Sequence, residues 1–88
     1  MQINKDFTIQ KVGASYVAVA VGETSKNFHG MIRLNETGAF LWNQMTERDM
    51  TEAELVDALL AEYDVDRETA EKDVQRIIKS LKAYPIFA

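Results

Sequence analysis

The sequence predicts an α+β domain in which a three-stranded antiparallel β-meander precedes three α-helices, in a winged helix-turn-helix-like arrangement. Three observations support this prediction. Short stretches of apolar and β-branched residues, separated by turn residues, extend as far as Leu34. Beyond Leu34 the apolar residues recur at three- and four-residue steps, which is the period of a helix. Residues that favour helix N-termini stand at Asn35, Thr51 and Asp66.

The first half of the chain predicts three strands. Residues 8–12 and 16–21 form the first two, and the turn residues 13–15 separate them. Residues 28–34 form the third strand, in which side chains alternate between two faces. One face carries Phe28, Ile32 and Leu34, and the other carries His29, Met31 and Arg33. As the last strand of a meander, it is expected at an edge of the sheet.

The first helix is expected to begin after Asn35, whose side chain is a good acceptor for the free amides of the first turn. Glu36 then lies favourably near the positive end of the helix dipole. Gly38 costs about 1 kcal/mol relative to alanine inside a helix, so we expect another backbone to approach closely there. Trp42 lies at helical spacing from apolar neighbours and is predicted to anchor the core.

The second helix has a complete N-terminal signature. Thr51 and Glu54 have the spacing of a capping box, in which each side chain bonds the other residue's backbone amide. Met50 and Leu55 have the spacing of a hydrophobic staple, which packs the residue before the cap against the first turn. A helix is therefore predicted from residue 52 to about residue 63.

Asp66 is predicted to cap the third helix. Its apolar stripe recurs at three- and four-residue steps through Ala70, Val74, Ile77, Ile78 and Leu81. Pro85 stops the helix, because proline lacks an amide donor and disfavours helix in the preceding residue. Ile86 and Phe87 are then expected to fold back on the core.

Composition limits the possible functions. The 88 residues are expected to form one domain over 1–88. A formal net charge of −4 argues against a nucleic-acid partner. The absence of cysteine excludes disulfides and thiolate metal sites and fits a reducing cytosol. No signal peptide and no run long enough to span a membrane occur, so we expect a cytoplasmic protein without a membrane partner.

The sequence gives no reason to expect an enzyme. His29 is the only histidine and has no cysteine to accompany it, while the serines lack an evident base. The carboxylates gather at helix starts and on solvated helix faces, where helix-dipole complementarity and solubility explain them. No glycine-rich phosphate loop joins a strand to a helix. We therefore expect no catalytic residue, no metal and no cofactor.

The order of three motifs carries a family resemblance. Residues 34–42 read LNETGAFLW, residues 62–66 read EYDVD after the second helix, and Asp73-Val74 lies in the third. Together they resemble the PqqD-like family of peptide-recognition domains, over residues 8–87. Residues 46–49 replace the Asp-Gly that commonly follows the first helix, and Tyr84-Pro85 replaces a glycine near the end. Both departures affect turns and weaken the subfamily assignment.

The resemblance implies that the leader segment of a ribosomally made precursor peptide pairs with the third strand as an added strand. It also implies a groove between that strand and the third helix. The strand wall would comprise Phe28, His29, Gly30, Met31, Ile32, Arg33 and Leu34. The helix wall would comprise Val74, Ile77, Ile78 and Leu81, with Arg76 and Lys79 at its margins. A peptide-modifying enzyme, often a radical S-adenosylmethionine protein in this family, would be the second partner.

The sequence is compatible with three alternatives. A winged-helix DNA-binding regulator would share the fold, although the third helix mixes acidic with basic residues. An acyl carrier would need serine at a helix start, whereas Ser80 lies deep in a helix. The exposed edge strand could instead serve homodimerisation, so a monomer or a weak homodimer is expected. Which alternate residues of the third strand face a ligand also stays open.

Overall fold

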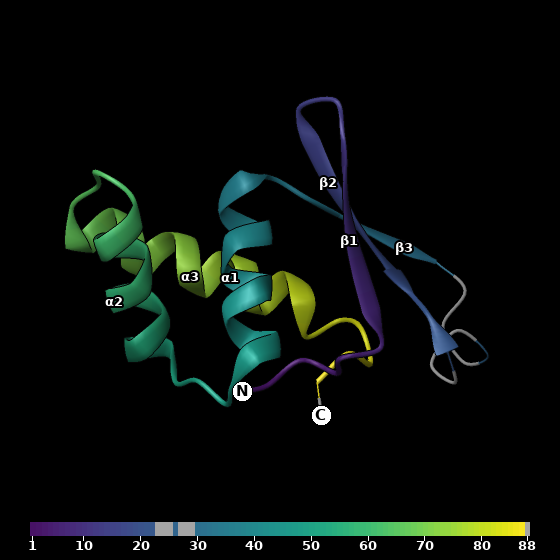
Figure 1. The fold of residues 1–88 in the computed structure, drawn as a ribbon. Coiled ribbons are helices and arrows are strands. Elements are labelled where there is room, and N and C mark those ends of the chain that lie inside the picture. The colour runs from purple at the N-terminus through teal and green to yellow at the C-terminus, as the bar shows by residue number, and fades with distance from the viewer. Residues whose placement is uncertain (23–25, 27–29, 88) are drawn as a thin grey trace.

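The computed structural model describes residues 1–22, 26 and 30–87. Strands β1 (Phe7–Val12), β2 (Ser15–Ala20) and β3 (Met31–Leu34) precede helices α1 (Glu36–Glu47), α2 (Glu52–Glu62) and α3 (Arg67–Leu81). Figure 1 shows the three helices packed together on one side of the sheet. The predicted α+β class and the order of its elements are confirmed. The described part of the third strand begins at Met31, later than the expected residue 28.

The sheet is antiparallel, with strand order β1-β2-β3. A two-residue turn of Gly13 and Ala14 joins β1 to β2, and Val12 pairs directly with Ser15 across it. Gly13 has a φ of 63°, in the left-handed region that a glycine adopts without steric cost. A positive φ at the first turn residue alone is the pattern of a type II′ turn, whose twist matches that of the flanking strands.

Trp42 anchors the core, as the sequence predicts. Its side chain is 1% exposed and packs edge-to-face on Phe7 of β1, with ring centroids 5.4 Å apart and planes at 76°. The same core joins apolar residues from β2, β3 and all three helices. The amphipathic stripe of α3 is part of it, because Ala70, Val74, Ile77, Ile78 and Leu81 are all buried.

The predicted N-caps are confirmed, but the explanation for Gly38 is wrong. The Asn35 side chain accepts a hydrogen bond from the Gly38 amide at 2.8 Å. A Cβ on Gly38 would lie 3.0 Å from the Asn35 Oδ1 atom and about 3.5 Å from the Leu34 side chain. The crowding therefore comes from the capping side chain and not from another backbone.

The capping box of α2 is complete. Thr51 Oγ1 accepts from the Glu54 amide at 3.2 Å, and the Glu54 carboxylate accepts from the Thr51 amide at 3.0 Å. Met50 and Leu55, the predicted staple, are both buried in the common core. Asp66 likewise caps α3 by accepting from the Thr69 amide at 2.8 Å.

Both terminal segments pack on the core. The Ile3 amide donates to the Met45 carbonyl at 2.9 Å, and the Asn4 amide donates to the Ile86 carbonyl at 2.8 Å. Ile3 and Ile86 are fully buried, and Ile3 also forms a β-bridge with Phe87. The predicted return of residues 86 and 87 is thus confirmed. The contribution of Ile3 was missed, because a single apolar residue among polar ones has no periodicity.

Candidate functional site

The outer edge of β3 is the first candidate site. In the described part of the chain β3 pairs with β2 alone, with Ile32 opposite Ala18 and Arg33 opposite Val17. The prediction that this strand lies at an edge of the sheet is therefore confirmed. An edge strand presents backbone N–H and C=O groups that another extended chain can pair with.

The hairpin determines which residues present those groups. A two-residue turn is closed by a hydrogen-bonded pair, so Val12 and Ser15 bond each other and Ser15 faces β1. Successive residues of a strand direct their backbone groups to opposite sides. Tyr16 therefore faces β3, Val17 faces β1, and Ala18 faces β3.

The same alternation determines which residues of β3 direct their backbone groups toward β2 and which direct them to the open edge. Ala18 and Ile32 are a hydrogen-bonded pair, and Leu34 bonds β2 in the same way, two residues farther along. Met31 and Arg33 lie between these bonded positions, so their N–H and C=O groups point to the open edge. The parity that the sequence leaves open is thus settled by the register of the first hairpin.

The side chains of β3 alternate as predicted over its described residues. Ile32 and Leu34 are 3% and 7% exposed and belong to the core, whereas Met31 is 65% exposed and Arg33 is exposed as well. Gly30 is exposed and precedes the strand. The other two residues of the predicted strand wall, Phe28 and His29, lie outside the described residues. A peptide at this edge would therefore meet a core-facing apolar pair and an outward pair.

The residues predicted as a helix wall form a buried face of α3. Val74, Ile78 and Leu81 are almost fully buried, and Ile77 retains 8% of its surface. They share one core with the inward residues of β3, so strand and helix are joined through common packing. Ile77 is therefore the residue of this predicted wall that keeps the most exposed surface.

Arg76 and Lys79 are exposed on the solvent side of α3, three residues apart and opposite the buried stripe. The Arg76 guanidinium lies 3.4 Å from the Asp73 carboxylate, on the same helix. Such an exposed pair contributes little to stability. Both cations are placed to influence a charged ligand at longer range and are not part of a built pocket.

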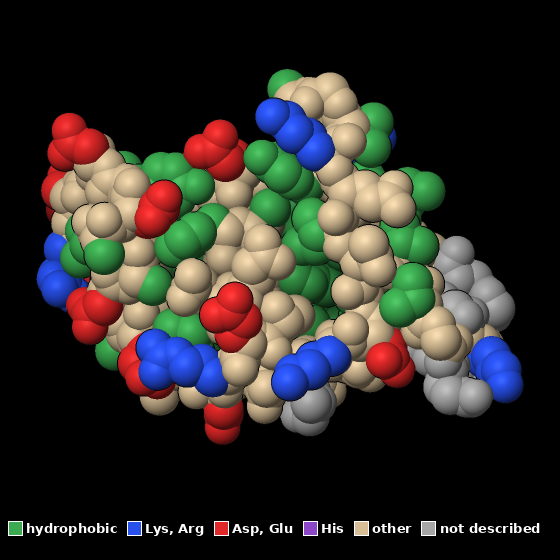
Figure 2. All heavy atoms as spheres, viewed as in Figure 1, with side chains coloured by type: hydrophobic (Ala, Val, Ile, Leu, Met, Phe, Trp, Pro, Cys, Tyr) green, Lys and Arg blue, Asp and Glu red, His purple; other side chains and the backbone are tan. Residues whose placement is uncertain are grey.

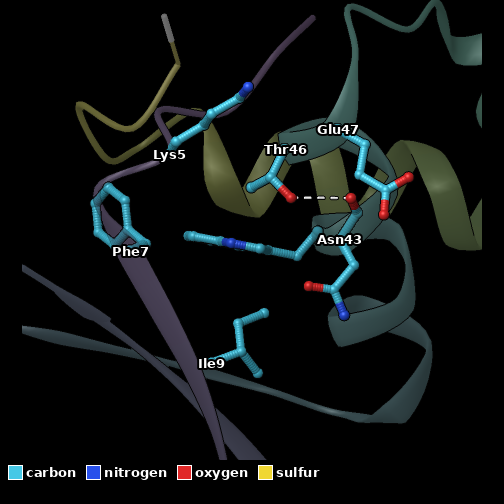
Figure 3. Close-up of a pocket in the computed structure, with 7 residues that line it drawn as sticks. Lys5, Phe7, Ile9, Asn43, Thr46 and Glu47 are labelled. Carbon is cyan, nitrogen blue, oxygen red and sulfur yellow. Dashed lines mark hydrogen bonds between the residues drawn. The ribbon is translucent and has the colours of Figure 1, made fainter.

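A pocket of about 430 Å³ that was not predicted from the sequence lies between α1 and β1, the edge strand opposite β3. Figure 3 shows Phe7 and Ile9 of β1 facing Asn43, Thr46 and Glu47 of α1. Thr46 Oγ1 donates to the Asn43 carbonyl at 2.9 Å, so its hydroxyl is engaged within the helix. The pocket has a mixed lining, with apolar Phe7, Ile9 and Trp42 beside polar Lys5, Asn43, Thr46 and Glu47.

Among the described residues, two groups have clearly shifted pKa values, and both lie at helix ends. Burial, together with a hydrogen bond to Glu36, raises the pKa of Tyr63, whose ring also packs edge-to-face on Phe40. The hydrogen bonds from Thr69 lower the pKa of the Asp66 cap. Both shifts are explained by local structure.

The described residues contain no group of three or more His, Asp or Glu placed to hold a metal ion. They likewise include no helix with the length and apolar character needed to cross a membrane.

Two solved structures share the fold of this chain. The structure resembles that of TbiB1 in complex with the TbiA(beta) leader peptide, with a TM-score of 0.66 and 26% identity over 94% of this chain and 90% of that one. It also has the fold of lasso peptide synthetase B1 complexed with the leader peptide, with a TM-score of 0.65 and 21% identity over 97% and 93%. No curated protein matches the chain. The family model of coenzyme PQQ synthesis protein D (PqqD) matches residues 16–85. The chain therefore belongs to the PqqD family.

Proposed function

We propose that this protein is a non-catalytic domain that captures the leader segment of a ribosomally made precursor peptide. The peptide adds as a fourth strand to β3 and hydrogen-bonds with the backbone of Met31 and Arg33. The observation that carries the proposal is the open edge of β3, with its outward donors and acceptors. Two similar folds that were solved with leader peptides support it.

Strand addition divides affinity and selectivity between backbone and side chains. Backbone pairing supplies affinity that depends little on peptide sequence, whereas side-chain contacts select among peptides. On the inner side the peptide would cover the margin of the core at Ile32, Leu34 and Ile77. On the outer side it would lie beside Met31, whose flexible thioether adapts to varied partners.

The captured peptide would be presented to a peptide-modifying enzyme, which we propose to be a radical S-adenosylmethionine protein, as is frequent in this family. Holding the leader raises the effective concentration of the core peptide near that enzyme's active site. The domain itself supplies no catalytic residue, metal or cofactor. We propose that it works in the cytoplasm as a monomer, with neither nucleic acid nor a membrane as partner.

Amide hydrogen exchange measured by nuclear magnetic resonance tests this function. The probe is a synthetic peptide translated from a short open reading frame that neighbours the gene, added to the full chain. In the free domain the Met31 and Arg33 amides exchange rapidly, because they face solvent, whereas those of Ile32 and Leu34 are protected by β2. We expect binding to slow exchange at Met31 and Arg33. Tight binding that leaves both amides fast would show that the peptide docks elsewhere.

Sedimentation of the free chain separates capture from self-association. If the β3 edge serves homodimerisation, the free domain sediments as a dimer and its Met31 and Arg33 amides are protected without peptide. We expect a monomer and fast exchange. A filter-binding assay with duplex DNA at low salt is expected to show no retention, since α3 mixes acidic with basic residues and the chain has a formal net charge of −4.

A further inference from the structure

The one charged side chain of β3 has no carboxylate partner in the described part of the chain. Ion pairs there engage Arg48, Arg67, Lys72 and Arg76, but none engages Arg33. Arg33 is exposed on the outer face of the sheet, next to the open edge. A guanidinium offers five donors in a planar fork that matches a carboxylate.

The sheet itself leaves only one side from which a carboxylate could reach Arg33 as a cross-strand neighbour. On the β2 side its direct partner is Val17, an apolar residue that is almost fully buried. Along its own strand the next side chain on the same face is Met31. The open edge is therefore the side on which an added strand would place a residue opposite Arg33.

The geometry of an added strand then sets a three-residue pattern in the ligand. A residue directly opposite Arg33 projects from the same face, with Cβ atoms about 4.5–5.5 Å apart. Its two neighbours along the ligand project to the other face, where Ile32 and Leu34 meet the core. The ligand therefore places one side chain in reach of a cation and two against apolar surface.

We propose that Arg33 is a specificity-determining residue and that the ligand is a peptide with an apolar–acidic–apolar tripeptide, whose Asp or Glu pairs with Arg33. This inference rests on the proposed strand addition and names the class of peptide it accepts. Charge segregation along the chain supports it. Residues 47–73 hold eleven Asp and Glu against three Lys and Arg, whereas the rest of the chain holds three against seven. Figure 2 shows most of the visible acidic side chains over the helices and few over the sheet. An acidic peptide is thus attracted to the sheet and repelled by α2.

A display library of randomised linear dodecapeptides, selected on the full chain, tests the proposal. We expect Asp or Glu to be enriched at a position flanked by apolar residues. Selection on Arg33→Glu is expected to replace that acid with Lys or Arg. Arg67→Glu makes the same change of charge at the exposed start of α3, outside the predicted site, and serves as the matched control, so its selection is expected to retain the acid.

One selected peptide is then measured by calorimetry with its acid intact, neutralised or changed to lysine. Neutralising the acid is expected to weaken binding to the wild-type chain by up to about fivefold. The lysine peptide is expected to bind Arg33→Glu more tightly than it binds the wild-type chain. If the peptides bind with protection of the Met31 and Arg33 amides, but neither the acid nor Arg33 matters, this inference fails and strand addition stands. If no peptide protects those amides, strand addition itself fails.

Discussion

Proline substitutions at two neighbouring residues of β3 are predicted to have opposite effects. Ile32→Pro removes an amide that bonds the Ala18 carbonyl, and Ala18 is fully buried. An unsatisfied buried carbonyl costs about 1–3 kcal/mol. Reshaping a buried isoleucine adds about 1–2 kcal/mol. The variant therefore loses about 2–5 kcal/mol of the roughly 4–13 kcal/mol expected for a domain of this length, and unfolds or melts far below the wild-type chain.

Met31→Pro is predicted to stay folded and to lose peptide binding. The Met31 amide faces the open edge and its side chain is 65% exposed, so the free energy of unfolding changes by no more than about 1 kcal/mol. In the complex, the same change leaves one peptide carbonyl without its donor and puts a ring at the edge. We expect at least about a tenfold loss of affinity, which corresponds to 1.4 kcal/mol.

Thermal melting by circular dichroism and calorimetry with a peptide that binds the wild-type chain measure the two effects. Met31→Ala is the control, because it shortens the same side chain but keeps the amide, and it is expected to bind. A folded Met31→Pro variant with wild-type affinity would refute strand addition at this edge. A fully stable Ile32→Pro variant beside an unfolded Met31→Pro variant would instead reverse the parity derived from the hairpin.

Three further predictions concern the core, the exposed cations of α3 and the N-cap of α3. Trp42→Ala is expected to lower the free energy of unfolding by about 3–5 kcal/mol, because the indole is 1% exposed, and chemical denaturation measures this loss. A fluorescence emission maximum of the native protein like that of a solvated indole would contradict the burial of Trp42. Arg76→Ala and Lys79→Ala are each expected to slow peptide association and reduce its salt dependence, while most of the affinity remains. Complete loss of peptide binding from either change would mean that ion pairing holds the peptide. Because the pKa of Asp66 is lower in the folded chain than its value of about 3.8 in the unfolded chain, ionised Asp66 stabilises the fold above pH 3.8, and this stability is lost as the pH falls through the folded-state pKa. Asp66→Asn keeps a capping oxygen but does not titrate, so it is expected to remove this part of the pH dependence of melting in acid. An unchanged pH dependence would show that Asp66 contributes nothing to it.

The sequence alone predicted the elements whose signals are local. The capping box at Thr51 and Glu54 lies within four residues, and the stripe of α3 repeats within one helical turn. The core position of Trp42 followed from the same periodicity. Because each signal involves residues near one another in the chain, tertiary contacts are not needed to read it. The PqqD-like resemblance likewise rested on the order of short motifs.

Tertiary structure decided what depends on residues far apart in the chain. The crowding at Gly38 is a local exception: it comes from Asn35 and Leu34, and the folded first turn of α1 was needed to identify them. The burial of Ile3 requires the return of Ile86 from the other end of the chain. The outward direction of the Met31 and Arg33 backbone groups depends on the register that pairs Ala18 with Ile32. A shift of one residue in that pairing would exchange every inward and outward group of β3, and only the packed sheet determines which arrangement forms.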